Sequence, residues 1–298
     1  MKCLNSFLVV VTAMLAMSAG CKSGNEDKRP VLVVSIEPQR HMLEQLIGDN
    51  FRIVTMMPSG NNPETYEPSP AKRMALEDAK AYFTTGNLIF EDNLYLATKD
   101  TSLFVDTSGG LDLIYGTHSH AENHSVFLPH DIEEEDKHHM ADPHIWSSVK
   151  NARHIVQVMA STLLRIDPDN SEEYMSRLDR YDAHLDSLDK VFSKKLANID
   201  NRQFLVWHPS LSYFARDYGL NQISVGSETK ESSAESLGNL LDMAKANKIN
   251  TFIYQRELDS RHVDLISASL DAKILPFNGL DYNWETELTK IVDGLSKQ

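Results

Sequence analysis

The stretch that decides the fold is residues 169–199, DNSEEYMSRLDRYDAHLDSLDKVFSKKLANI. Its apolar side chains recur at intervals of three and four, the spacing of one helix face: Tyr174, Leu178, Tyr181, Leu185, Leu188, Val191, Phe192 and Leu196. No glycine or proline interrupts the run, so it predicts one helix of roughly 45 Å at 1.5 Å per residue. Such a helix is long for a globular protein. We therefore expect a rigid linking helix between two lobes, which limits how far one lobe can close on the other.

The residues before this helix alternate between short β-branched runs and amphipathic stretches. They predict strands at Val31–Ile36, Phe51–Met56, Ala81–Thr84 and Leu103–Asp106. They predict helices at Arg40–Gly48, Ala71–Lys80, Leu88–Leu96 and Val149–Ile166, with a loop at Gly60–Pro70. Strand–helix alternation with short connectors is typical of an α/β domain, here residues 31–168.

The same alternation resumes after the helix, over residues 200–298. Predicted strands lie at Phe204–Trp207, Asn221–Val225, Thr251–Tyr254 and Lys273–Phe277. Predicted helices lie at Ser212–Tyr218, Ser233–Asn247, Ser260–Leu270 and Trp284–Leu295. The fold class is therefore α/β, with two α/β lobes, and no sequence repeat is visible between them.

The length and net charge of the chain limit the classes of function that it can have. The chain has 298 residues, enough for one large or two ordinary domains, and a formal net charge of −14. Negative charge disfavours nucleic acid and attracts cations, so we expect no nucleic-acid partner.

Residues 1–21 have the pattern of a secretory signal: a positive start, a short apolar run and small residues before Cys21. The apolar run is too short for a permanent membrane span. Small residues before a cysteine resemble a bacterial lipobox, which implies a lipidated Cys21 followed by a polar tether at 22–30. We expect an extracytoplasmic protein that a lipid anchor holds to a bacterial membrane, in the periplasm or at the cell surface. The alternative is a free thiol at an irregular N-terminus.

The only other cysteine, Cys3, would be lost with the signal. No thiolate would then remain for a metal or for an internal disulfide. Any metal site must be built from His, Asp, Glu and amide side chains.

Residues 118–146 are rich in imidazole and carboxylate, the natural ligands of zinc and its neighbours. We interpret residues 117–141 as a loop that collects metal weakly and delivers it to a fixed site. Its candidate ligands are His118, His120, His124, His130, His138 and His139. The alternative is a solvated acidic loop whose histidines bind nothing.

Three candidate ligands for the fixed site are Glu64, His144 and His208. Glu64 follows a predicted strand, His144 ends the His-rich tract, and His208 directly follows the strand at Phe204–Trp207. Ligand groups of α/β lobes gather past the carboxyl ends of strands, so two facing lobes could bring these side chains into one cleft. Each has a simpler interpretation: a turn residue for Glu64, packing beside Trp146 for His144, and an ordinary helix start for His208.

Three segments, GNNPETYEPSP around Glu64, DPHIW around His144 and WHPSLSYFARDYGL from Trp207, resemble signature motifs of the zinc- and manganese-binding subunits of bacterial ABC metal importers. The resemblance covers nearly the whole chain after the signal. It implies two α/β lobes bridged by a rigid helix, one divalent metal in the cleft, and a monomer that docks onto a membrane permease with its ATPase. An acidic, His-rich loop before the second motif is a feature of the zinc branch of this family.

The chain departs from the family pattern at three positions. Glu64 stands where the family usually has His, Asn278 where it usually has a carboxylate, and Gln255 at another frequent glutamate position. The ligand set is then most simply Glu64, His144 and His208, with an amide, water or Asp281 as the fourth ligand.

Two histidines with a carboxylate also suit Mn²⁺ or Fe²⁺, but zinc binds more strongly at a given N/O site, so we expect Zn²⁺. Imidazole must be neutral to bind, so affinity should fall as pH drops through about 6.5. A zinc hydrolase is the enzyme alternative. It is disfavoured because no HExxH occurs and no second carboxylate is obviously placed as a general base. Glu67, three residues after Glu64, is the best candidate for that role. A surface adhesin is a third class, but the sequence shows neither repeats nor aromatic patches.

Overall fold

We describe the protein from a computed structural model, which covers residues 27–63, 65–115, 141–225, 234–255, 263–270 and 272–297. The predicted signal with Cys21, the residue Glu64, the six loop histidines and the side chain of Gln255 lie outside the described residues. Among the helices that are described, none has the length and apolar character needed to cross a membrane.

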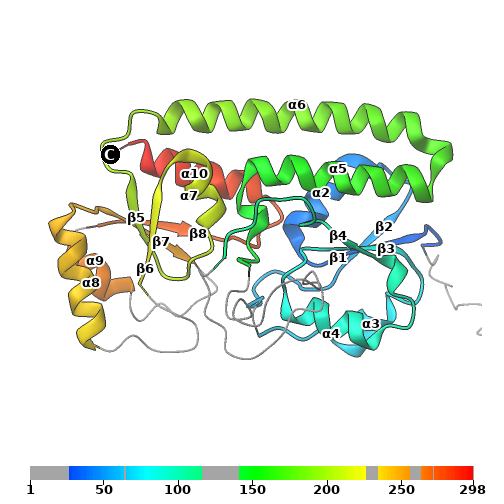
Figure 1. The fold of residues 1–298 in the computed structure, drawn as a ribbon, viewed down its shortest axis with the longest axis horizontal. Helices are drawn as coiled ribbons and strands as arrows, with labels where there is room; N and C mark the ends of the chain where they lie inside the picture. The colour runs from blue at the N-terminus through cyan, green and yellow to red at the C-terminus, as the bar shows by residue number, and fades with distance from the viewer. Residues whose placement is uncertain are drawn as a thin grey trace, which may run out of the picture.

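The first lobe is built on a parallel four-stranded sheet in the order β2-β1-β3-β4. The central strand β1 has all four side chains buried, as expected for a strand covered on both faces. The strands are β1 (Val31–Val34), β2 (Arg52–Thr55), β3 (Ala79–Thr84) and β4 (Phe104–Asp106). The helices are α2 (Glu37–Ile47), α3 (Pro70–Met74), α4 (Ile89–Ala97) and α5 (Val149–Ile166), with α3 and α4 on the side of the sheet away from α5 (Figure 1).

The second lobe has a parallel sheet in the order β6-β5-β7-β8. Its strands are β5 (Gln203–Val206), β6 (Asn221–Ser224), β7 (Thr251–Gln255) and β8 (Lys273–Phe277). Its helices are α7 (Ser212–Tyr218), α8 (Ala234–Ala246), α9 (Val263–Leu270) and α10 (Trp284–Leu295). Each sheet places its second strand at the edge, followed by the first, third and fourth. The lobes therefore share a strand order, although no sequence repeat between them is visible.

Alternation along β5 divides the core of the second lobe between the two faces of its sheet. Phe204 and Val206 belong to the large core that includes α6 and α10. Leu205, between them, packs with residues of α8 and α9 in a separate cluster. The period of two along a strand thus buries both faces of this sheet.

The linking helix is α6 (Ser171–Leu196), an unbroken 26-residue helix that runs along the top of both lobes in Figure 1. At 1.5 Å per residue it is about 39 Å long. It begins after a short 3₁₀ turn at Pro168–Asn170 and ends three residues before the predicted end at Ile199. The prediction of a long helix joining two α/β lobes is confirmed.

Helix α5 is fastened to α6 by a forked ion pair. The Arg153 guanidinium donates to both oxygens of Asp182, each at 2.7 Å, and to Asp186 at 3.2 Å. A planar guanidinium that bonds a carboxylate through two nitrogens fixes orientation as well as distance.

The two lobes are not independent hydrophobic units. One continuous core contains residues of β1 and α2, of α5 and α6, and of α7 and α10. Trp146 of the first lobe and Phe214 of the second belong to it and are almost fully buried. Relative movement of the lobes would therefore disturb a packed core and not only a linker.

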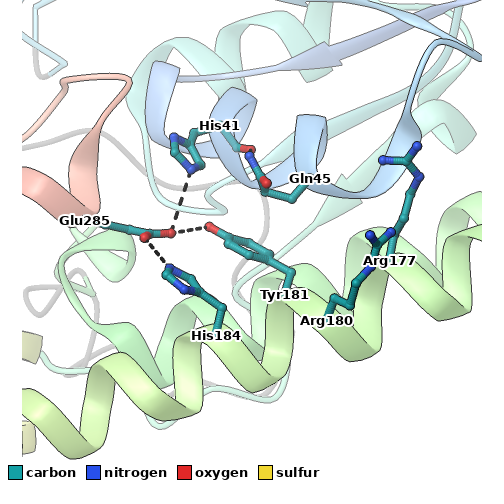
Figure 2. A pocket seen from close by; sticks show the side chains of 7 residues that line it. All are labelled: His41, Gln45, Arg177, Arg180, Tyr181, His184 and Glu285. Carbon is teal, nitrogen blue, oxygen red and sulfur yellow. Dashed lines mark hydrogen bonds and ion pairs between the residues drawn. The ribbon is translucent and has the colours of Figure 1, made fainter.

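A polar junction joins three helices beside this core (Figure 2). The Glu285 carboxylate at the start of α10 accepts hydrogen bonds from the Tyr181 hydroxyl at 2.8 Å and from His184 Nε2 at 2.6 Å, both on α6. His41 Nε2 of α2 lies 3.7 Å from the same carboxylate. One carboxylate thus touches the first lobe, the linking helix and the second lobe.

The predicted helix at Ala71–Lys80 is wrong beyond Met74, where α3 ends. The N–H groups of Leu76, Glu77 and Ala79 bond carbonyls three residues back, which is a run of tight turns. Ala79 already pairs with Val31 of β1, so β3 begins two residues before its predicted start. The sheet, formed with a strand distant in sequence, takes residues that local periodicity assigned to a helix.

Candidate metal centre

The segment that carries His144 is a tight turn held by one carboxylate. Asp142 Oδ1 accepts the backbone N–H of His144 at 2.9 Å and lies 2.8 Å from its Nδ1. Both side chains are buried, with Asp142 at 0% and His144 at 3% exposure. The carboxylate accepts the Nδ1 proton, so the lone pair of the ring is on Nε2, which is the arrangement of a metal-binding histidine.

His208 comes from the opposite lobe. It is the second residue after β5 and is 5% exposed. The N–H of Ser210 donates to the His208 carbonyl at 2.8 Å, which turns the chain sharply after the strand. The imidazole therefore lies past the carboxyl end of a central strand, as predicted.

The two imidazoles meet between the lobes. Their Nε2 atoms are 3.3 Å apart, and their ring planes are inclined at 67°. Two nitrogens bound to one zinc ion at 2.0–2.1 Å in tetrahedral geometry stand about 3.3–3.4 Å apart. The observed separation therefore suits two ligands of a single ion.

Trp146 packs beside His144, with ring centroids 5.1 Å apart, as the simpler interpretation of this histidine predicted. This packing is compatible with a place for His144 at the metal site. The indole Nε1 donates to the Gly279 carbonyl of the second lobe at 2.8 Å. The segment around His144 is thus tied to the loop that holds Asn278 and Asp281.

Those two candidates for the fourth ligand bond within their own turn. Asn278 Oδ1 accepts the Leu280 N–H at 3.0 Å, and Asp281 Oδ1 accepts the Asn283 N–H at 2.8 Å. In the described ranges, no three side chains of His, Cys, Asp or Glu are already grouped as a metal ion would require. Glu64 and the Gln255 side chain are outside those ranges, so the full ligand set stays a prediction.

Glu67, the best general base for a hydrolase, lies in a surface ion pair. It accepts from Arg73 at 3.3 Å and from Asn93 Nδ2 at 2.6 Å, and its side chain is 52% exposed. Both oxygens of this carboxylate are thus engaged by donors at the surface of the first lobe.

The sequence interpretation assigned no role to Asp142, although this residue begins the DPHIW segment. The signal was available, since an Asp two residues before a histidine forms an Asx turn that also reaches the ring. The sequence contains no comparable signal for the contact of Gly279 with Trp146, because a backbone carbonyl has no sequence signature.

Two parallel α/β lobes, one linking helix and an imidazole pair drawn from opposite lobes define a metal-binding protein of the solute-binding class. A sequence profile describing the zinc-uptake complex component A, periplasmic (ZnuA), matches residues 32–291. The chain belongs to this ZnuA family.

Relatives agree with this assignment. The chain is 27% identical over 298 residues to the high-affinity zinc uptake system protein ZnuA of Bacillus subtilis (strain 168), covering 98% of this chain and 87% of that protein. It is 26% identical to the zinc-binding lipoprotein AdcA of Streptococcus pneumoniae (strain ATCC BAA-255 / R6), covering 93% of this chain and 55% of AdcA. The chain therefore spans about half the length of AdcA.

Solved structures show the same fold. A crystal structure of ZnuA superposes with a TM-score of 0.78 at 30% identity, covering 90% of this chain and 98% of the other. A ZnuA deletion mutant with zinc bound gives 0.76 at 30% identity, covering 90% and 97%. The solute-binding protein FpvC of Pseudomonas aeruginosa, in complex with Mn²⁺, shares the fold with a TM-score of 0.75 at 18% identity, covering 91% and 98%.

Proposed function

We propose that this protein captures Zn²⁺ outside the cytoplasmic membrane and delivers it to the permease of an ABC importer, which its ATPase drives. The observation that carries the proposal is the buried pair His144 and His208, whose Nε2 atoms stand 3.3 Å apart across the lobe boundary. The zinc-uptake names of its relatives support the same cargo.

The proposed ligands are Glu64, His144 and His208. A water molecule or one of Asn278, Asp281 and Gln255 completes the coordination. The imidazole of His144 is already oriented by Asp142, so binding requires little rearrangement on that side of the site. The histidines of loop 117–141 act as weaker, exchangeable sites that raise the local metal concentration.

We propose the domain organisation that the sequence predicts: a signal at 1–21, a tether at 22–30, lobes at 31–168 and 200–298, and the linking helix at 169–199. Lipidation of Cys21 would hold the protein, as a monomer, at the outer face of a bacterial membrane. The lipoprotein name of AdcA supports the anchor. The protein performs no catalysis of its own in this scheme.

Metal competition on the chain that begins after Cys21 tests the function. Zn²⁺, Mn²⁺ and Fe²⁺ are titrated without oxygen, and sites are counted for the parent chain, the His144→Ala variant and a deletion of residues 118–139. We expect one tight zinc site that His144→Ala abolishes and the deletion preserves, with weaker sites lost in the deletion.

Two outcomes would change the assignment. Preference of the tight site for Mn²⁺ or Fe²⁺ would mean that Glu64 has redirected the cargo. A tight site that survives His144→Ala but disappears with the loop would refute the proposed centre.

A further inference from the structure

Helix α7 and His208 form one short structural unit. The helix begins at Ser212, four residues after His208. The Ser210 N–H donates to the His208 carbonyl at 2.8 Å, and the Ser212 hydroxyl donates to the Pro209 carbonyl at 3.3 Å. A displacement of α7 would therefore also displace the His208 imidazole.

This unit belongs to the second lobe but holds the backbone of the first lobe on both sides of loop 117–141. The Tyr213 hydroxyl donates to the Asp142 carbonyl at 2.8 Å and accepts from the Ile114 N–H at 3.3 Å. The Asp142 N–H donates to the Ile114 carbonyl at 2.7 Å, which closes a small ring of hydrogen bonds. Tyr213 is fully buried, so water does not compete for these contacts.

The phenol is held firmly in its donor form. Burial raises the pKa of Tyr213 above its ordinary value, so the hydroxyl keeps its proton at any physiological pH. The Arg216 guanidinium lies 5.1 Å from the centre of the same ring and donates to the Asp112 carbonyl at 2.6 Å. Two residues one turn apart on α7 therefore fasten residues 112–114 and 142.

We propose that Tyr213 is a positioning residue for the metal centre: through Asp142, it fixes the His144 imidazole at the separation from His208 that one ion requires. Asp142 gives its carbonyl to Tyr213 and its carboxylate to His144, while His208 stands five residues before Tyr213 on the same unit. The contacts thus connect the two imidazoles through protein atoms. This inference rests on the proposed function, because it takes His144 and His208 as zinc ligands.

The test compares two variants of one helix in the full chain, kept in detergent. Tyr213→Phe removes the hydroxyl described above. Tyr218→Phe is the matched control, because its buried hydroxyl donates instead to Asp189 of α6 at 2.8 Å. Zinc affinity, the visible absorption spectrum of bound Co²⁺ and the melting temperature of the metal-free protein are measured for both.

We expect Tyr213→Phe to weaken zinc binding about tenfold, the lower end of the loss seen when a residue that supports a metal ligand is changed. The Co²⁺ spectrum, which reports ligand geometry, should change as well. Tyr218→Phe should keep the parent affinity and spectrum even where its melting temperature falls by a similar amount.

The proposal is overturned if Tyr213→Phe keeps the parent affinity and spectrum, or if Tyr218→Phe weakens zinc binding equally. Should Tyr213→Phe fail to fold, Arg216→Gln removes the bond to Asp112 and must weaken zinc by a smaller factor; parent affinity in that variant also overturns the proposal. The His144→Ala variant distinguishes failure of the proposed function from failure of the role of Tyr213. Unchanged zinc binding in His144→Ala refutes the proposed function, whereas loss there with none in Tyr213→Phe refutes only the role of Tyr213.

Discussion

At the scale of single residues, Asp142 decides which nitrogen of His144 faces the site. Its carboxylate accepts the Nδ1 proton and the backbone N–H of the same residue, so ring orientation and turn geometry depend on one side chain. A charged acceptor on one ring nitrogen also makes the other nitrogen a stronger ligand.

Replacement of Asp142 by Asn should weaken zinc binding about tenfold, because the amide accepts the same hydrogen bonds without the negative charge. Isothermal titration or a competing chelator measures the change. Asp106→Asn is the matched control, since Asp106 Oδ1 also caps a residue two positions on, the Ser108 N–H at 2.8 Å. Equal losses in both variants would contradict the special role of Asp142.

Glu91 is a second carboxylate with a measurable consequence. It is fully buried and accepts the N–H groups of Thr85 at 2.7 Å and Gly86 at 2.9 Å. Burial raises the pKa of its carboxyl from 4.5 to about 7, while hydrogen bonds from Ser35, Thr85 and Leu88 act in the opposite direction. The folded state therefore binds the proton more tightly than the unfolded state.

From this sign, the Glu91 contribution to the free energy of unfolding is largest below about pH 4.5 and is lost as pH rises toward about 7. The loss is on the order of 3 kcal/mol. Urea unfolding at pH 5 and pH 8 should show a larger drop for the parent chain than for Glu91→Gln. The variant should be less stable at both pH values, because its amide nitrogen cannot accept the backbone N–H groups. Identical drops would rule out titration of Glu91 in this range.

At the scale of elements, predictability followed the range of the interactions that form each element. The linking helix and the central strand β1 could be predicted, because the spacing of apolar residues that identifies each of them occurs within one continuous segment. The predicted end of helix α3 at Lys80 was six residues too late, since only the pairing of Ala79 with Val31 reveals where β3 begins. The histidine pair was foreseeable, because His208 follows a predicted strand and His144 ends the His-rich tract. The contacts by which Tyr213 and Gly279 hold the segment around His144 could not be predicted, because they depend on how the lobes pack.

The clamp between α5 and α6 gives a prediction at this scale. Arg153→Lys should lower the free energy of unfolding by about 1 kcal/mol, because an ammonium cannot reproduce the forked contact with Asp182. Arg180→Lys on α6 is the control, since Arg180 has no carboxylate partner among the described residues. Chemical denaturation measures both. A larger effect at Arg180 would show that the forked pair contributes little.

At the scale of the whole molecule, the continuous core and the junction at Glu285 make the two lobes one folding unit. Calorimetry of the metal-free protein should show a single transition. Two separate transitions in the parent chain would contradict the shared core.

Glu285→Gln should lower the free energy of unfolding by about 1–3 kcal/mol, because three partners on two helices lose a charged acceptor. Glu173→Gln is the control, as Glu173 forms an exposed pair with Arg177 one turn along α6.

The unbroken helix α6 also bears on how a bound ion would leave. Because one helix and one hydrophobic core span both lobes, wide opening would have to disrupt buried contacts. The imidazoles, however, stand 3.3 Å apart, and an added separation of about 1 Å already stretches a metal–nitrogen bond beyond its 2.0–2.1 Å range. Under the proposed function, a protein of this stiffness would retain zinc when alone. It would release zinc when a docked importer moved the two imidazoles apart by this small distance.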